Sequence, residues 1–184
     1  MSATTSTLVQ TGTWNIDPAH SSVEFQVKHL GIATVKGLFS EFEGTLEVGA
    51  DGIPTKAYGS VKVDSVDTRE EQRDAHLRSP DFFDAASHPE LTFAATAIEP
   101  VDEDTFTVTG DLTIHGVTQQ VTFDAELQGV EQDPWGNERF AVEVTGQIKR
   151  SDFGMTFNQA LGSGNMLVSD KVKINLDISA VKAA

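Results

Sequence analysis

Apolar and polar residues alternate with a period of two from Trp14 almost to the end of the chain, and this alternation restricts the fold to β-sheet. Val23, Phe25 and Val27, for example, are separated by polar residues, as on a strand with one face in a core and the other in water. The same alternation recurs at Phe106, Val108, Leu112 and Ile114; at Val121, Phe123, Ala125 and Leu127; at Phe140, Val142, Val144 and Ile148; and at Val172, Ile174, Leu176 and Ile178. So many half-buried antiparallel strands must hide their edges, and a sandwich or a closed barrel does so. We therefore predict an all-β fold, and a barrel would have an interior able to hold a ligand.

The composition indicates one acidic domain. The chain has 184 residues, with 13 Lys and Arg against 28 Asp and Glu, and its net charge is −15 with His neutral. Such a surface repels phosphate backbones and anionic membranes, so we expect no nucleic-acid partner. An apolar small molecule is still permitted, because it meets the interior and not the surface. Cysteine is absent, so the fold uses no disulfides or thiolate ligands.

The opening stretch is rich in Ser and Thr and offers too little apolar surface to dock. We therefore predict a flexible N-terminal tail over residues 1–12 and one barrel domain over residues 13–184. This stretch has no basic start and no apolar run of the length that a signal peptide needs. The chain has no run of about 18 apolar residues either, so we expect no stable membrane insertion and a cytoplasmic location.

One segment departs from the strand pattern. Thr68 is followed three residues later by Glu71, which is the spacing of a helix capping box. This spacing predicts a short helix that runs to about Arg78 and ends at Ser79-Pro80.

Two adjacent aromatic residues, Phe82 and Phe83, follow this helix and cannot both point to one face of a strand. We expect the helix and the Phe pair to close one end of the barrel. Leu77, Phe82 and Phe83 suit simple core packing as well as contact with a ligand.

Turn-forming residues separate the alternating segments without suggesting a domain boundary. We expect hairpin connections at Asp51-Gly52, Glu99-Pro100, His115-Gly116 and residues 133–137. The His115-Gly116 pair suits a two-residue loop that needs positive φ, which gives this histidine a structural explanation. The apolar phase also changes between Phe39 and Phe42, which predicts a bulge or bend there.

Several short motifs follow one another in a fixed order. They are Trp14-x-Ile16-Asp17-x-x-His20-Ser21 with Val23, Phe25, Val27 and His29; Val35-x-Gly37-x-Phe39; Arg73-Asp74-x-His76-Leu77-Arg78-Ser79-x-Asp81-Phe82-Phe83-Asp84 with Pro89 and Phe93; Gly110-Asp111-Leu112-Thr113-Ile114-His115-Gly116-Val117-Thr118; and Arg150-Ser151-Asp152-Phe153-Gly154. Together they resemble the signature of the YceI-like, polyisoprenoid-binding proteins, and the resemblance covers about Trp14 to Val181. Any one of these motifs alone would be a weak signal, but the ordered set is specific.

The resemblance implies an extended, lipocalin-like, eight-stranded antiparallel barrel with one or two short helices near one end. It also implies an elongated apolar tunnel that takes a long-chain isoprenoid or other amphiphilic lipid. Each buried methylene contributes up to about 0.8 kcal/mol, so affinity would come from chain length and selectivity from tunnel shape. We expect the following residues to contact the ligand: Val23, Phe25, Val27, His29, Val35, Phe39, Phe42, Arg73, His76, Leu77, Phe82, Phe83, Phe93, Leu112, Ile114, Arg150, Phe153 and Met155.

Arg150 falls on the inward face of its predicted strand, where a guanidinium must find an acceptor. In a functional interpretation it anchors a headgroup near one tunnel mouth, since guanidinium donors suit phosphate, pyrophosphate or quinone oxygens. In a structural interpretation it pairs with Asp152, Asp17 or Asp81. The sequence leaves both interpretations open.

Three further polar residues are ambiguous. His29 is in phase with Phe25 and Val27, and it is either a hydrogen-bonded core residue or a ligand contact. Arg73 and His76 are three residues apart on the predicted helix, so they could face one site together, although Arg73 also suits a solvent-exposed position.

Metal chemistry and nucleophilic catalysis have little support. The five histidines are scattered, without His-x-His or His-Glu-x-x-His spacing, so we expect no metal site and no cofactor. Gly162-Ser163-Gly164 lacks the strand-turn-helix context of a nucleophile elbow. The surrounding loop, residues 158–165, could instead be a mobile lip beside the tunnel entrance, with Phe153, Met155 and Phe157 supplying apolar contacts.

Two functions of different classes follow. The favoured one is non-catalytic carriage or sequestration of a long-chain isoprenoid, of the polyprenyl or isoprenoid quinone type. The alternative is an enzyme that isomerises or hydrolyses such a lipid, with His29 or His76 as acid or base beside Arg150. No paired titratable motif occurs, which favours carriage, whereas an interior filled by its own side chains would favour a scaffolding role. Whether two barrels pair as a homodimer is left open.

Overall fold

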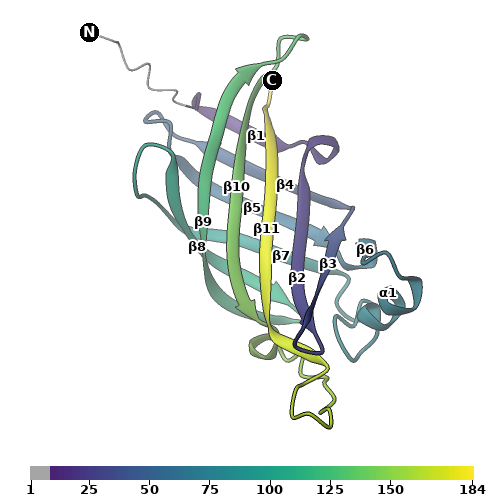
Figure 1. The fold of residues 1–184 in the computed structure, drawn as a ribbon. Coiled ribbons are helices and arrows are strands. Elements are labelled where there is room, and N and C mark those ends of the chain that lie inside the picture. The colour runs from purple at the N-terminus through teal and green to yellow at the C-terminus, as the bar shows by residue number, and fades with distance from the viewer. Residues whose placement is uncertain (1–8) are drawn as a thin grey trace.

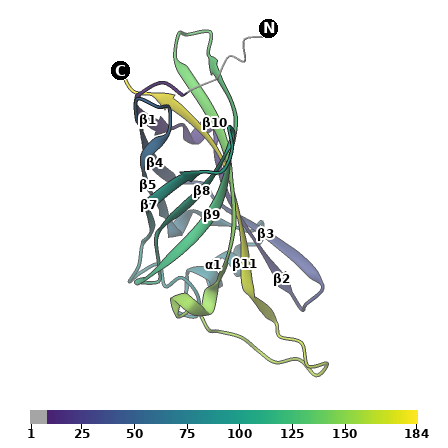
Figure 2. The same ribbon diagram turned by 90° about the vertical axis from the view of Figure 1, so that its left-hand side faces the viewer.

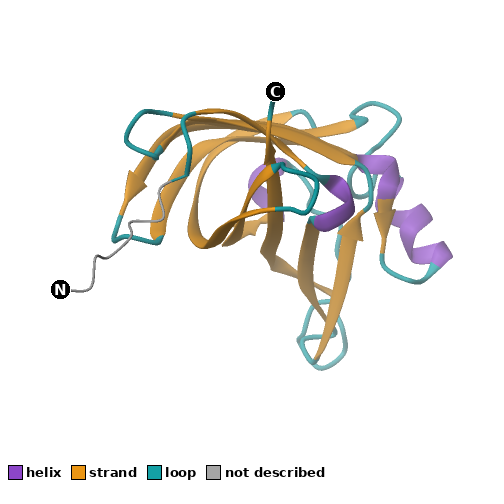
Figure 3. Ribbon diagram, turned by 90° about the horizontal axis from the view of Figure 1, so that it is seen from above, coloured by secondary structure: helices purple, strands orange, loops and turns teal. Residues whose placement is uncertain are grey.

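The structure, a computed structural model, describes residues 9–184 and consists mostly of antiparallel strands (Figures 1 and 3). The strands are β1 (Gly12–Ile16), β2 (Ser22–His29), β3 (Ala33–Phe39), β4 (Phe42–Val48), β5 (Pro54–Lys62), β6 (Val66–Asp67), β7 (Glu90–Pro100), β8 (Thr105–Ile114), β9 (Val117–Gln132), β10 (Glu138–Lys149) and β11 (Val168–Lys182). The helical elements are one α-helix, α1 (Glu71–Arg78), and three 3-10 turns, η1 (Pro18–His20), η2 (Val63–Ser65) and η3 (Arg150–Phe153). Within residues 9–184, no helix is long and apolar enough to cross a membrane.

Eight of the strands close into a barrel. Their hydrogen-bonded order is β1-β4-β5-β7-β8-β9-β10-β11, and β11 returns to pair with β1, with Trp14 opposite Lys182. All neighbouring pairs in this circuit are antiparallel. Closure leaves no free edge to the circuit, which is the advantage that a barrel has over an open sheet. The predicted eight-stranded antiparallel barrel is confirmed.

The three remaining strands extend the sheet beyond this circuit in the order β2-β3-β6. Strand β11 is long enough to pair with β1 near its C-terminus and with β2 along its earlier part. The β2–β3 hairpin and the long loop of residues 154–167 project from the barrel at the same end (Figure 2). They touch each other, since the Leu30 N–H donates to the Leu167 carbonyl at 2.9 Å and Asn165 Nδ2 donates to the Leu30 carbonyl at 3.4 Å.

The barrel has two distinct ends. We call the first the terminal end: it carries both described termini and the turns at residues 49–53, 101–104 and 133–137 (Figure 1). We call the opposite one the loop end: it carries the turn at residues 115–116, η3 and the loop of residues 154–167. Because successive strands of the barrel are antiparallel, every second turn returns to the same end.

Helix α1 has the predicted extent but a different cap. Its N-cap is Glu70, whose carboxylate accepts hydrogen bonds from the backbone N–H groups of residues 72 and 73 at 3.2 and 2.7 Å. Thr68 is instead buried, and both its N–H and its hydroxyl donate to Asp74. The capping box predicted at Thr68 is therefore wrong. Arg69 takes the left-handed conformation (φ 69°) and turns the chain between Thr68 and the helix.

Most of the predicted turns are confirmed. Hairpin connections occur at Asp51-Gly52, His115-Gly116 and residues 133–137. His115 and Gly116 both have positive φ, 56° and 73°, as a two-residue loop between antiparallel strands requires. The turn predicted at Glu99-Pro100 comes later, at residues 101–104, because β7 continues through Pro100.

The predicted change of apolar phase corresponds to a change of strand. The chain leaves β3 at Phe39 and begins β4 at Phe42, and the two strands pair with different neighbours. The bend between them carries the chain from the β2 side of the sheet to the β5 side.

Packing into the barrel begins closer to the N-terminus than the sequence predicted, at Val9 instead of residue 13. Of the predicted tail, residues 1–8 lie outside the described residues, but Val9 is buried beside Trp14 and Phe140. The Trp14 indole is completely buried, lies edge-on to Phe140 at 4.8 Å between ring centroids, and donates to the Gln10 carbonyl at 3.0 Å. These contacts lie where β1 and β11 close the barrel.

A three-residue ion-pair network also holds the terminal end. Arg139 Nη1 donates to Asp17 at 2.9 Å, and Arg139 Nε donates to Asp133 at 2.7 Å. The hydrogen bond from Arg139, followed by that from His20, lowers the pKa of Asp17 to about 2. The hydrogen bond from Arg139 also holds the pKa of Asp133 well below its usual range. The network ties the β1–β2 connection to the β9–β10 hairpin.

Candidate functional site

Most of the buried hydrophobic side chains belong to one of two separate clusters, one toward each end of the barrel. The cluster at the loop end comprises Leu112, Ile114, Phe123, Ile148, Phe153 and Met155. The cluster at the terminal end comprises Val9, Trp14, Val48, Phe140 and Ala180. Inward-facing side chains between the two clusters, such as Phe25 and Val144, are only partly buried. A barrel packed throughout by its own side chains would bury these residues fully, so the pattern indicates a hollow.

The hollow is a cavity of about 760 Å³ with predominantly apolar walls. Its volume lies in the range typical of sites for small organic ligands. The middle of the wall is formed by Phe25, Val27, Phe93, Val108, Phe123, Val142, Val144, Ile174 and Leu176. These residues come from β2 and β7 to β11, so the cavity runs inside the barrel and not between surface loops.

Three glycines make room for aromatic rings of the barrel interior. A Cβ atom at Gly37, Gly110 or Gly146 would overlap the ring of Phe25, Phe93 or Phe123, respectively. Each ring therefore lies over a backbone without a side chain.

The two ends of the cavity differ in charge. At the terminal end its lining includes Asp51 from the β4–β5 turn and Asp102, Glu103 and Asp104 from the β7–β8 turn. Hydrogen bonds from Thr105 and Asp104 lower the pKa of Asp102, so this carboxyl is ionised at neutral pH. At the loop end the lining includes the cation Arg150 beside Phe82. The cavity thus has an acidic rim at one end and a guanidinium at the other.

Arg150 is buried, with 5% of its surface exposed, and backbone carbonyls hold it. Its Nε and Nη2 atoms donate to the carbonyls of Ser169 and Val168 at 2.9 and 3.2 Å. Its Nη1 atom donates to the carbonyl of Met155 at 2.8 Å. The guanidinium carbon also lies 5.9 Å from the centre of the Phe82 ring.

No direct ion pair neutralises this cation. Within residues 9–184, no carboxylate oxygen lies within 4.0 Å of the guanidinium. Asp170 is the nearby acid that favours the charged form, but its carboxylate accepts hydrogen bonds from the Ser151 N–H and hydroxyl at 2.9 and 2.8 Å. Burial lowers the pKa of Arg150 from its ordinary value, and the charge of Asp170 opposes this shift. Arg150 also borders a smaller, more open hollow beside Asn158 and Ser169.

The structure places 13 of the predicted site residues in the cavity wall. They are Val23, Phe25, Val27, Phe39, Phe42, Leu77, Phe82, Phe83, Phe93, Leu112, Ile114, Arg150 and Met155. They come from five strands, from α1 and the segment after it, and from η3 and the residues that follow it, and the fold brings them around one space. Their contact with a ligand stays a prediction.

Two of the predicted site residues that lie outside the cavity wall are on strands β2 and β3. His29 ends β2 at the hairpin, beyond the cavity, and Val35 lies opposite Val27 on β3. Neither contributes to the cavity lining.

The other three residues outside the wall have structural partners. Arg73 is exposed and donates from Nε and Nη2 to Thr68, at 2.8 Å to the hydroxyl and 2.7 Å to the carbonyl. His76 Nε2 lies 2.9 Å from a carboxylate oxygen of Asp81, and its ring packs against Phe82 from outside the cavity. Phe153 is almost completely buried in the loop-end cluster.

The acidic partners proposed for Arg150 are wrong. Asp17 pairs with Arg139, Asp81 lies beside His76, and Asp152 makes no ion pair with Arg150. Arg150 lines the cavity, but it begins η3 instead of continuing the predicted strand, which ends at Lys149. Its acceptors are backbone carbonyls, which no sequence pattern could identify.

Many wall residues were missing from the predicted site although their strands were recognised. Phe123, Ala125, Phe140, Val142, Val144, Ile148, Val172, Ile174, Leu176 and Ile178 all line the cavity. Each belongs to an alternating set visible in the sequence, so the inward phase of β9 to β11 was the signal that could have found them. The acidic rim had no comparable signal, because its residues lie in turns.

The loop of residues 158–165 lies beyond the loop end, where Ala160 pairs with Met166. The apolar residues expected to accompany it have different positions. Met155 lines the cavity, whereas Phe157 packs edge-on against His76 and Phe82 at 5.0 and 5.3 Å between ring centres. The role of this loop as a mobile lip stays a prediction.

Sequence comparison with known proteins finds a matching family model and several similar relatives. The sequence model of the YceI-like domain family matches residues 14–180. A UPF0312 protein of Staphylococcus aureus strain MSSA476 is 40% identical over 162 residues, which cover 87% of this chain and 92% of the relative.

Solved structures show the same fold. The chain is similar to a YceI protein of Campylobacter jejuni, with a TM-score of 0.75 and 33% identity over 85% of this chain and 90% of that one. Burkholderia cenocepacia BcnA has a TM-score of 0.75 and 26% identity over 89% and 98% of the two chains. A polyisoprenoid binding domain from Saccharophagus degradans, with a TM-score of 0.71 and 17% identity over 92% and 98%, has a similar fold.

Proposed function

This chain belongs to the YceI-like domain family, and from that membership and its hollow barrel we propose that it binds one long-chain isoprenoid-type lipid in the barrel cavity and releases it chemically unchanged. The ligand class is a polyprenyl lipid, an isoprenoid quinone or a related amphiphile with one long apolar chain. The observation that carries the proposal is the apolar cavity of about 760 Å³ along the inside of the barrel.

The energetics of burial support a chain-like ligand. Each methylene removed from water contributes up to about 0.8 kcal/mol, so ten of them contribute up to about 8 kcal/mol. Loss of translational and rotational freedom offsets several kcal/mol of this sum. A long chain therefore reaches useful affinity through its length alone, without many polar contacts.

The charges at the two ends support one orientation of the lipid. The acidic rim of Asp51 and residues 102–104 repels an anionic headgroup, whereas Arg150 at the loop end attracts it. Arg150 has no direct carboxylate partner within residues 9–184, and guanidinium groups bind phosphate and quinone oxygens well. We therefore expect the headgroup at the loop end and the chain extending toward the terminal end.

The positions of the histidines support binding without catalysis. The enzyme hypothesis required His29 or His76 as an acid or base within hydrogen-bond distance of the lipid. Neither residue lines the cavity, and no histidine occurs among the described lining residues. A scaffolding role is disfavoured because the interior is not filled by its own side chains.

Several finer points rest on the sequence and the resemblance. The isoprenoid nature of the chain is supported by the family and by the fold shared with the polyisoprenoid binding domain from Saccharophagus degradans. A quinone headgroup, a cytoplasmic location and pairing into a homodimer stay predictions.

A pair of matched Trp substitutions tests the proposal. Val144→Trp adds a large ring inside the cavity, whereas Ile32→Trp adds the same ring at an exposed position of the β2–β3 hairpin. Delipidated protein is titrated with a fluorescent polyprenyl analogue. We expect 1:1 binding to wild type and to Ile32→Trp, with binding at least tenfold weaker in Val144→Trp. Equal affinity in all three proteins, with circular dichroism showing native folds, would place the ligand outside the barrel and refute the proposal.

A further inference from the structure

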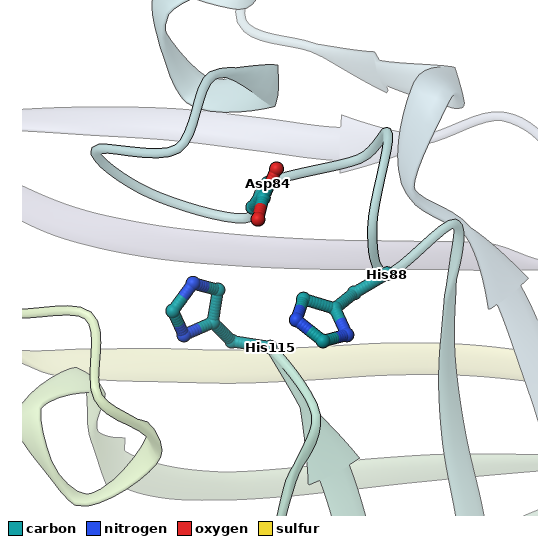
Figure 4. Close-up of side chains that lie close together, drawn as sticks. All are labelled: Asp84, His88 and His115. Carbon is teal, nitrogen blue, oxygen red and sulfur yellow. The ribbon is translucent and has the colours of Figure 1, made fainter.

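Three side chains with metal-ligating chemistry converge at the loop end, outside the cavity wall. They are Asp84 and His88, from the segment after α1, and His115, from the β8–β9 turn (Figure 4). One ligand atom from each residue lies within 4.8 Å of the ligand atoms of the other two, and all three residues are half-buried. The histidine spacing along the sequence predicted no metal site, but the fold brings together residues that no spacing rule connects.

A tight local turn positions the first two residues. The backbone N–H of His88 donates to the Asp84 carbonyl at 2.8 Å, which closes a turn between them. Asp84 takes the left-handed conformation (φ 52°), which is rare for residues other than glycine, although Asp tolerates it. The turn places both side chains close to His115 (Figure 4).

Close packing on the β8–β9 turn positions His88 further. Its ring lies over Gly116, where a Cβ atom would come within 2.6 Å of the imidazole. The rings of His88 and His115 are 5.2 Å apart between centres at an interplanar angle of 64°. The absence of a side chain at Gly116 therefore permits both the positive φ of the turn and the close approach of the His88 ring.

Hydrogen bonding leaves ligand atoms available. His115 Nδ1 lies 3.2 Å from the Phe153 carbonyl, and because a carbonyl only accepts, this bond places the proton on Nδ1. The lone pair of His115 is then on Nε2. A histidine that donates its other N–H to a backbone carbonyl is the usual arrangement around metal ions. Within residues 9–184, neither the Asp84 carboxylate nor the His88 ring makes a hydrogen bond to another side chain or to the backbone.

We propose that Asp84, His88 and His115 bind a divalent first-row transition ion, with Zn²⁺ as the expected occupant. Two neutral imidazoles and one carboxylate form a donor set that suits Zn²⁺, and three protein ligands leave a further position for water. Ligand atoms about 2.1 Å from a tetrahedral ion are about 3.4 Å apart. Side-chain movements of about 1 Å therefore complete the site from separations of up to 4.8 Å. The net charge of −15 also favours cation binding.

The ion would cross-link the segment after α1 to the β8–β9 turn at the loop end of the barrel. Phe83 immediately precedes Asp84, Ile114 immediately precedes His115, and both line the cavity. The His115–Phe153 hydrogen bond links the same site to η3. The site thus connects three segments that are otherwise joined by few hydrogen bonds.

Metal titration of the full chain tests this inference. Tag-free protein is stripped with a chelator and titrated with Co²⁺, which reports its coordination through d–d absorption, and with Zn²⁺ in a calorimeter. We expect one ion per chain, Co²⁺ bands of a four- or five-coordinate site, and a Tm that rises by about 5–10 °C when Zn²⁺ is at 100 times its Kd. Absence of saturable binding at micromolar concentrations would overturn the proposal.

Matched variants identify the ligands. Asp84→Asn keeps a residue that tolerates the left-handed conformation, and His88→Gln removes an imidazole that does not line the cavity. Each should weaken Zn²⁺ binding by at least tenfold while retaining the native circular dichroism spectrum. His20→Gln, which removes an exposed histidine at the other end of the barrel, should bind like wild type. Unchanged affinity in both Asp84→Asn and His88→Gln, or lost affinity in His20→Gln, would show that the ion binds elsewhere.

Discussion

Replacing Arg150 with Met should destabilise the barrel, because three backbone carbonyls lose the guanidinium as a hydrogen-bond donor. The guanidinium donates to the carbonyls of Ser169, Met155 and Val168, and these bonds join η3 to the start of β11. Met has a similar length and no donor, so it removes all three bonds and adds no new charge. The substitution therefore removes the three hydrogen bonds together with the positive charge while keeping the side-chain volume similar.

The size of the effect follows from which carbonyls keep a partner. The Val168 carbonyl also accepts from Asn158 Nδ2 at 2.7 Å, so it stays bonded. The carbonyls of Ser169 and Met155 lose the donor that Arg150 provides, at about 1–3 kcal/mol for each buried orphan. Burial of the Met side chain offsets about 1.5–3 kcal/mol of this loss. The net expectation is a decrease of about 2 kcal/mol in the free energy of unfolding.

Urea unfolding of lipid-free protein, followed by tryptophan fluorescence, measures this change. In a thermal melt followed by the same fluorescence, the Tm of Arg150→Met should fall by roughly 4–8 °C. Lys173→Met is the matched control, since Lys173 is exposed on β11, and its stability should stay within about 0.5 kcal/mol of wild type. Wild-type stability in Arg150→Met would refute the reasoning, because it would mean that these carbonyls do not depend on the guanidinium.

Three further predictions concern the headgroup, the pH dependence of stability and the closed end of the barrel. Wild type should bind a polyprenyl phosphate about tenfold or more tightly than the polyprenol of equal length, and Arg150→Lys, which loses the planar fork of donors, should narrow this ratio in calorimetric titrations; an unchanged ratio would argue against a headgroup at Arg150. The pKa of Asp17 is lowered to about 2 in the folded chain from an ordinary value of 3.8, so its contribution is fully present above pH 3.8 and is lost as the pH falls toward 2. After allowance for solvent screening this contribution is about 1 kcal/mol, so between pH 5 and pH 2 wild type should lose about that much more stability in urea than Asp17→Asn does, and parallel pH profiles would contradict the assignment. Trp14→Ala should cost about 3–5 kcal/mol of unfolding free energy, since the completely buried indole packs where β1 meets β11, and a loss below 1 kcal/mol would show that this closure matters little.

The alternation of residues predicted the fold and much of the cavity wall for one physical reason. In a closed barrel every second residue of a strand faces the interior, so the phase of Phe25 or Phe93 also indicates its environment. The resemblance to the YceI-like family added the number of strands and the hollow interior, which alternation alone does not specify. Residues such as Val144 and Ile174 could have been included by the same criterion.

What the sequence did not predict depends on backbone geometry and topology. The acceptors of Arg150 are carbonyls, which every residue carries and no pattern distinguishes. The N-cap of α1 is Glu70 and not the predicted Thr68. The left-handed conformation of Arg69, which lies between them, cannot be predicted from an arginine side chain. The Asp84, His88 and His115 cluster depends on the β8–β9 turn lying beside the segment after α1, a tertiary contact between distant parts of the chain.

The central claim is that the barrel interior holds a long lipid chain, and native mass spectrometry of protein purified without added lipid tests it most directly. The account predicts one bound long-chain isoprenoid or related amphiphile per barrel, identified after organic extraction, and its loss from Val144→Trp but not from Ile32→Trp. Protein that emerges empty, and that also fails to take up quinones, polyprenyl phosphates or fatty amides when they are supplied, would contradict it.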